Sequence, residues 1–269
     1  METTMKSNRY FKDIGVMTGR CMAHAFRSMD TIIKIIVMPI IFMLLFVYVF
    51  GGAIRLGTQN GSYIDYMLPG ILLMSISTGI AYAAVRPNED VTKGIFERFH
   101  SMPIAKSSIL WGHVVTSVAS CFISLAVIIL FALLLGFRPT AGIGAWLGIS
   151  GILLMFTLAT TWLAILSGLA AKSVEGASVF SYPLIYLPFL SSTFVPTESM
   201  PAALRAFAEN QPVTAIVEAV RSLLKNEPAG SSILLALLWC VAIMIVAFYF
   251  AMRAYRRRVS SGVYTVSLP

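Results

Sequence analysis

The chain has 269 residues, of which 58% are hydrophobic and only 12% are charged, whereas a soluble domain carries about 25% charged residues. Its net charge is +8 and its mean hydropathy is +0.82. So few charges cannot cover so much apolar surface, which excludes a soluble enzyme, a disordered tail and a DNA-binding domain. We therefore interpret the chain as an all-α integral membrane protein with no nucleic-acid partner.

Long charge-free segments predict the membrane spans. A helix needs about 20 apolar residues to cross a hydrocarbon core roughly 30 Å thick, whereas barrel strands are shorter and alternate in polarity. Six runs without Asp, Glu, Lys or Arg reach this length, and they predict six transmembrane helices in a single domain, 1–269. The runs are Ile35–Ile54, Tyr66–Val85, Ser107–Phe137, Pro139–Ala171, Gly176–Thr197 and Pro228–Met252.

The distribution of Lys and Arg around these runs predicts the orientation of the chain. One side of the membrane receives 15 of the basic residues, including those of 1–34, 86–106 and the tail 253–269, and the other side receives 5. Basic residues accumulate on the cytoplasmic side. We therefore expect a multi-pass protein of the cytoplasmic membrane with both termini in the cytoplasm.

The N-terminal segment 1–34 has the pattern of an amphipathic helix on the inner leaflet. Within residues 9–30, apolar side chains recur at helical spacing and basic residues are available for anionic headgroups of membrane lipid. The apolar positions are Tyr10, Ile14, Met17 and Cys21, and the basic ones are Lys12, Arg20 and Arg27. A frayed basic tail remains the alternative.

The segment 86–106, cytoplasmic by the charge distribution, predicts a second short amphipathic helix. Asn88, Glu89 and Asp90 suit a helix start, and Pro103 ends the helix. The apolar face consists of Ile95, Phe96, Phe99 and Met102, with Lys93, Glu97 and Arg98 between. Such a helix could dock into a groove on a cytoplasmic partner or lie at the inner membrane interface, and periodicity alone leaves both interpretations open.

The segment 198–227, on the outer side by the charge distribution, predicts a helical hairpin between spans five and six. Pro201 and Pro212 each suit a helix first turn. An apolar stripe follows at helical spacing, formed by Val213, Ile216, Val217, Val220 and Leu224. We expect a helix half-sunk in the outer leaflet or folded back among the spans, an ordinary surface helix being the alternative. Three prolines in the preceding span, Pro183, Pro188 and Pro196, predict kinks or a broken helix.

Motifs for enzymatic chemistry are missing from the sequence. No GxxxxGK[ST] loop for phosphate occurs, no HExxH motif is present, and the three histidines are widely scattered. Ser150 misses a GxSxG elbow by one position. No acidic residue lies in the middle of a span, where a carrier coupled to protons or sodium would place one. We therefore expect a non-enzymatic subunit without a cofactor or metal of its own, driven by a partner.

Four stretches resemble permease subunits of the type-2 ABC exporters, and in particular the daunorubicin/doxorubicin-resistance permeases. Residues 39–54 are similar to the first span of that family, and 63–71 to the start of its second. The loop 90–104 resembles its coupling region, although Arg86 to Glu89 depart from its small or apolar pattern. The most specific stretch, 194–221, resembles its outer segment between spans five and six.

The resemblance implies an assembly of two permease chains with two ABC ATPase subunits that bind ATP and Mg, and we expect the second permease chain to be identical to the first. The residues implied in coupling to the ATPase are Asp90, Lys93, Gly94, Phe96, Glu97, Arg98, Phe99, Met102 and Pro103. Those assigned to an outer gate are Phe194, Pro196, Pro201, Arg205, Pro212, Glu218 and Arg221. We expect export of a hydrophobic or amphipathic, antibiotic-like compound. Alternatives are export of a lipid-linked polysaccharide or glycolipid, and a membrane enzyme or sensor.

Overall fold

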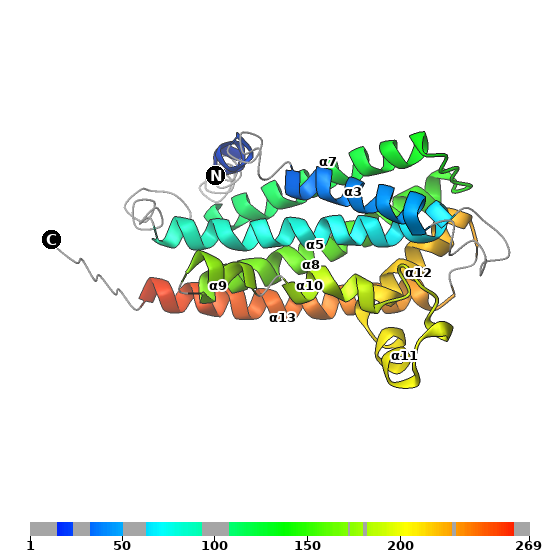
Figure 1. Ribbon diagram of the computed structural model, residues 1–269. Coiled ribbons are helices and arrows are strands. Elements are labelled where there is room, and N and C mark those ends of the chain that lie inside the picture. Colours follow the sequence, from blue (N-terminus) through cyan, green and yellow to red (C-terminus); the bar gives the residue numbers. More distant parts are fainter. Residues whose placement is uncertain are drawn as a thin grey trace.

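The computed structural model describes residues 15–23, 33–50, 63–92, 108–171, 173–179, 182–227 and 230–260. Within these ranges the regular structure is helical, and the helices run side by side as one bundle (Figure 1). The long ones are α5 (Tyr63–Thr92), α7 (Ser108–Leu134), α8 (Ile143–Ala170) and α13 (Ser232–Ser260). The described part of the chain is therefore all-helical, as the sequence predicted.

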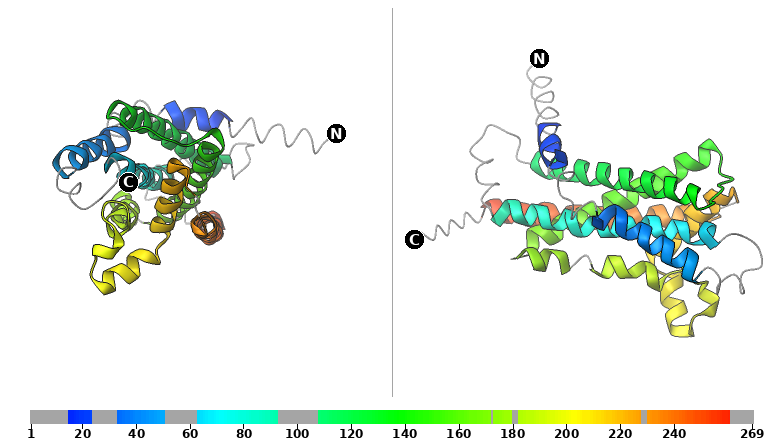
Figure 2. Two further views of the ribbon diagram at one scale, coloured as in Figure 1. Left: turned by 90° about the vertical axis from the view of Figure 1, so that its right-hand side faces the viewer. Right: turned by 45° about the horizontal axis from the view of Figure 1, so that its top comes forward.

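Four of the described helices are long and apolar enough to cross a membrane, namely those at Tyr63–Asp90, Leu110–Leu134, Ile143–Ala170 and Ser232–Tyr255. The most apolar window of α5 is 82% buried, whereas that of α13 is 17% buried. Helix α5 is therefore the centre of the bundle, and α13 lies at its edge, as the end-on view in Figure 2 shows. The exposed apolar side chains of α13 are suited to face lipid.

The first predicted span coincides with a shorter apolar helix, Ile35–Val49. It consists of α3 (Met38–Leu45) between two π-helical turns, η1 (Ile33–Val37) and η2 (Phe46–Phe50). Pro39 has no N–H to offer the carbonyl four residues earlier, that of Ile35. This carbonyl accepts hydrogen bonds from the hydroxyls of Ser75 (3.2 Å) and Ser124 (2.7 Å), which tie the segment to α5 and α7.

The fifth predicted span is interrupted, as its three prolines predicted. It contains α9 (Val174–Val179), α10 (Tyr182–Tyr186) and the 3₁₀ turn η3 (Leu187–Leu190). After Leu190 the chain turns, and η4 (Thr197–Ser199) is a further short 3₁₀ turn. The apolar helical stretch Val174–Leu190 is shorter than the four long spans.

The predicted outer hairpin is present as α11 (Ala202–Glu209) and α12 (Pro212–Lys225). Pro201 immediately precedes α11 and Pro212 is the first residue of α12, as expected from the fixed φ of proline. All five residues of the predicted apolar stripe of α12 are buried. Helix α12 therefore folds back into the bundle and packs on α8 and α13, whereas α11 projects from it (Figure 1).

The two ends of the bundle differ in content, and we name them the capped end and the basic end. The capped end holds α11, α12 and the first residues of α5, α8 and α13. The basic end holds the last residues of those three helices and Arg20, Arg86, Arg253 and Arg257. A helix at 15–23, part of the predicted amphipathic segment, lies at the basic end, where Met17 is buried close to Gly112.

One boundary differs from the expectation. We expected the second span to end at Val85 and residues 88–90 to start a new helix, but α5 continues through Pro87 to Thr92. The prediction was wrong because the polar side chains at this end have partners in the bundle. Arg86 donates to the carbonyl of Cys21 (3.1 Å), and Asn88 is fully buried against α8. A charged residue at the end of an apolar run therefore does not end this helix.

Candidate functional site

Arg221 of α12 fastens the capped end of the bundle. Its Nε and Nη2 donate to the carbonyl oxygen of Tyr66 (3.2 and 3.1 Å), and Nη2 also donates to that of Ser192 (2.8 Å). The guanidinium carbon lies 3.9 Å from the centroid of the Tyr66 ring, within cation–π range. The Tyr66 hydroxyl donates to the same Ser192 carbonyl at 2.9 Å. One side chain thus joins α12, α5 and the turn that follows η3.

Burial sets the electrostatics of Arg221. It lowers the pKa of the guanidinium, an effect that Tyr66 and Glu218 oppose. Because an arginine in a protein keeps its proton, the group acts as a fixed cation. Its bonds to two main-chain carbonyls are therefore charge-assisted and stronger than neutral ones.

An aromatic cluster lies beside this cation. The Phe194 ring stacks on Phe46, with centroids 4.3 Å apart and planes 9° apart, and it also touches Phe189 (5.1 Å). Phe189 in turn meets Phe42 edge-on at 6.3 Å. The turn after η3 thereby contacts the first apolar helix through rings, and α5 through Tyr63, whose hydroxyl donates to the Phe194 carbonyl at 3.4 Å.

Close packing at Gly70 completes the capped end. A Cβ atom at this position would lie 1.8 Å from Cγ2 of Thr193, so only glycine lets the turn approach α5 this closely. Gln211 donates to the Leu190 carbonyl, and the Thr214 hydroxyl donates to that of Ala208. The capped end is a closed, interlocked structure.

The structure separates the predicted outer-gate residues into two groups. Phe194 and Arg221 lie in the closed structure, and Pro212 and Glu218 belong to the helix that carries Arg221. By contrast, Arg205 is exposed on α11 and pairs with Glu209 at 2.7 Å, while Pro196 and Pro201 flank η4 in the projecting segment. Sequence reasoning missed Tyr66 and Ser192, since neither carries a motif.

At the basic end, Asp90 and His113 form the central polar contact. Asp90 Oδ2 lies 3.0 Å from His113 Nε2, and Oδ1 lies 3.9 Å from an Nη of Arg20. Nδ1 of the same imidazole lies 4.0 Å from the Cys21 sulfur. This contact joins α5, α7 and the helix at 15–23. Of the predicted coupling residues, only Asp90 belongs to the described ranges; Lys93, Gly94, Phe96, Glu97, Arg98, Phe99, Met102 and Pro103 lie outside them.

Asn88 locks the neighbouring end of α8. Its side-chain amide donates to the carbonyls of Gly168 and Ala171, both at 3.0 Å, and so satisfies acceptors that a helix terminus leaves unpaired. The helices are very close here, because a Cβ at Gly168 would lie 2.3 Å from the Ala84 carbonyl oxygen. The basic end of α5 is therefore held against both α7 and α8.

The features that suggested an enzyme do not come together. His113 is near the start of α7 at the basic end, whereas Ser150 lies in the capped half of α8, twenty residues before that helix ends. At 1.5 Å per residue this is about 30 Å of helix. His24 and His100 lie outside the described ranges, and within those ranges no three His, Cys, Asp or Glu side chains cluster to hold a metal ion.

The four long apolar helices define a class of protein: a multi-pass helical membrane protein. Comparison with known proteins identifies the family. The chain belongs to the ABC-2 type transporter family, whose model matches residues 12–225. It is an ABC transporter permease, as the resemblance implied.

Two relatives carry drug-resistance names. The chain is 31% identical over 230 residues to the daunorubicin resistance ABC transporter permease protein DrrB1 of Streptomyces coeruleorubidus. The aligned region covers 84% of this chain and 80% of that protein. The chain is 25% identical over 245 residues to the probable doxorubicin resistance ABC transporter permease protein DrrC of Mycobacterium tuberculosis, covering 90% and 87%. A putative transport permease, ycf38, of Porphyra purpurea is 24% identical over 225 residues, covering 82% and 76%.

Proposed function

We propose that the chain is the membrane subunit of an ATP-driven exporter that moves a hydrophobic or amphipathic, antibiotic-like compound out across the cytoplasmic membrane. Two copies of the chain, with two separate ABC ATPase subunits that bind ATP and Mg, form the working assembly. The basic end faces the cytoplasm, in agreement with the excess of Lys and Arg there. The two shorter apolar helices complete six passes.

The observation that carries the proposal is the continuity of α5. The whole helix of 30 residues is about 45 Å long. The part from Tyr66, whose carbonyl binds Arg221 at the capped end, to Asp90, which contacts His113 and Arg20, is about 36 Å long. The first residues of the predicted coupling loop, 86–92, belong to this helix, and the rest of the loop follows it in the sequence. A push on the loop would therefore act on a continuous helix whose other end contacts Arg221 at the capped end.

These contacts support the following mechanism. The ATPase grips the amphipathic helix predicted in the loop through Phe99, Met102 and Arg98. When the two ATPases close, they tilt α5, and the Tyr66 carbonyl shifts relative to Arg221. The stacked Phe46 and Phe194 rings then separate, and a path opens towards the outside.

The relatives and the character of the bundle support the proposed cargo. Two relatives are named for resistance to daunorubicin and doxorubicin. The side chains around the capped end are largely apolar and aromatic, which suits a hydrophobic or amphipathic compound. Export of a glycolipid remains the alternative for the same assembly.

The test is co-expression with candidate ABC ATPase subunits from the same genome. The double variant R98A/F99A should lose the ATPase on affinity purification and abolish drug-stimulated ATP hydrolysis in liposomes. The matched control is L134A/R138A, which also removes one apolar and one basic side chain, both exposed, from the capped end. ATPase retention and full stimulation in R98A/F99A would refute the coupling role. ATP hydrolysis by the purified permease alone would refute the division of labour.

A further inference from the structure

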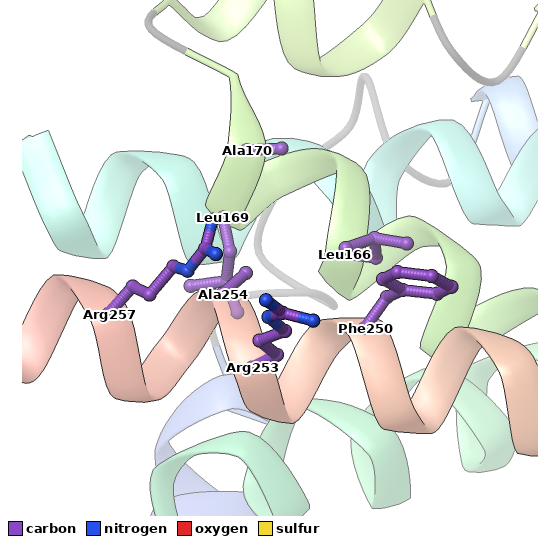
Figure 3. A pocket seen from close by; sticks show the side chains of 7 residues that line it. All are labelled: Leu166, Leu169, Ala170, Phe250, Arg253, Ala254 and Arg257. Atoms are coloured by element: carbon purple, nitrogen blue, oxygen red, sulfur yellow. The ribbon is translucent and has the colours of Figure 1, made fainter.

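A pocket of about 530 Å³ lies between α8 and α13 at the basic end (Figure 3). Apart from Arg253 and Arg257, its lining is apolar, and no acidic residue lines it. Figure 3 shows the two arginine side chains extending from α13 towards the last turn of α8, with the Phe250 ring near Leu166. The pocket combines a cationic part and an apolar part.

The pocket lies at the end of the apolar span of α13, where we expect hydrocarbon to give way to headgroups. The apolar span of α13 ends at Tyr255, so Arg253 and Arg257 fall on either side of its end. Four residues apart, they share one face of the helix, and Phe250 lies about one turn deeper on that face. Phe250 is 47% exposed and both arginines are exposed, so the pocket opens to the outside of the bundle.

We propose that this pocket binds an anionic phospholipid of the leaflet at the basic end. The lipid phosphate lies between the guanidinium groups of Arg253 and Arg257, and an acyl chain follows Leu166 and Phe250. Guanidinium groups match the oxygens of a phosphate in geometry and charge, and basic pockets between membrane helices recognise anionic headgroups. A soluble phosphate would leave the apolar part of the lining without a partner, so the proposed ligand carries an acyl chain as well as a phosphate.

The site gives the lipid a structural task. Helices α8 and α13 pack against each other along the bundle, whereas the contact of α13 with α12 lies at the capped end. A lipid bound between the last turns of α8 and α13 would hold α13 against α8 at the point where the basic tail begins. This inference concerns lipid binding by the chain itself and does not depend on the ATPase or the cargo.

The test measures lipid binding to the full-length chain in detergent by native mass spectrometry. Probes are dioleoyl-phosphatidylglycerol, dioleoyl-phosphatidylcholine and water-soluble glycerol 1-phosphate. Each surface arginine contributes roughly fivefold to the binding of an anionic headgroup, so R253Q/R257Q should weaken phosphatidylglycerol binding by roughly 30-fold. R138Q removes an exposed arginine from the capped end and should leave binding unchanged.

A second variant tests the apolar half. L166W fills the pocket without changing its charge and should also weaken phosphatidylglycerol binding, while melting temperatures measured in lipid-free detergent identify any misfolded variant. Phosphatidylglycerol affinity equal to wild type in both R253Q/R257Q and L166W would overturn the proposal. It would also be overturned if phosphatidylcholine bound as tightly as phosphatidylglycerol, or if glycerol 1-phosphate did.

Discussion

Replacing Arg221 with Met tests whether one guanidinium holds the cap closed. Methionine keeps the length and helix propensity of the side chain but removes every donor. The Tyr66 and Ser192 carbonyls lose their charged partner, and the cation–π contact at 3.9 Å is lost. Ser192 keeps one donor, the Tyr66 hydroxyl at 2.9 Å, so its carbonyl is not left unsatisfied.

The magnitude follows from these contacts. Hydrogen bonds to a charged group contribute about 1.5–3 kcal/mol each, and the guanidinium serves two carbonyls. Part of this gain is offset because the charge had to leave water. We expect a net loss of about 3 kcal/mol, which corresponds to a fall in Tm of roughly 6–12 °C for a domain of this size.

The assay is thermal unfolding of the purified chain in detergent, followed by tryptophan fluorescence. The matched control is R205M in the adjacent helix, because Arg205 is exposed and pairs only with exposed Glu209, a contact of little value to stability. Y66F keeps the ring and the carbonyl and loses one hydroxyl bond, so it should cost about 1 kcal/mol. Equal Tm values for R221M and R205M would refute the reasoning.

Two further predictions concern the ends of α5. D90N weakens the contact with His113 and should raise the rate of maleimide labelling at Cys21 roughly fivefold, the effect of about 1 kcal/mol on local opening. The other two cysteines, in α7 and α13, are buried and should not react. The control is E209Q at the capped end. An unchanged labelling rate in D90N would contradict the role of Asp90 in holding the helix at 15–23 against the bundle. G70A should lower Tm because its Cβ would meet the side chain of the facing turn at 1.8 Å. G151A has nothing within 4 Å and should not lower Tm, so an equal fall in both variants would contradict the packing argument.

Much of the fold could be predicted from charge-free runs, because a membrane helix must satisfy its own backbone and so needs a long apolar sequence. The runs Tyr66–Val85, Ser107–Phe137, Pro139–Ala171 and Pro228–Met252 each contain most of a long helix. Their ends were less predictable. The second run gave no sign that α5 would continue to Thr92, because the partners that receive its polar residues lie in other helices.

The candidate site was predictable only in part. Helical periodicity identified the buried stripe of α12, since spacing is local information. It could not indicate that Arg221, displaced from the stripe, reaches Tyr66, which lies 155 residues earlier in the sequence. Likewise His113 belongs to no motif, and its pairing with Asp90 follows from how α5 and α7 pack rather than from any spacing.

The unbroken course of α5 has a thermodynamic consequence for pharmacology. When a ligand at one site changes the affinity at a second, the second ligand changes the first affinity by the same factor. Tyr66 and Asp90 belong to one helix. If the proposed coupling through α5 holds, a molecule that binds the Arg221 cluster from outside the cell, in only one of its arrangements, would alter the affinity of the ATPase for the other end of the protein. An inhibitor of this transporter need not compete with either ATP or cargo.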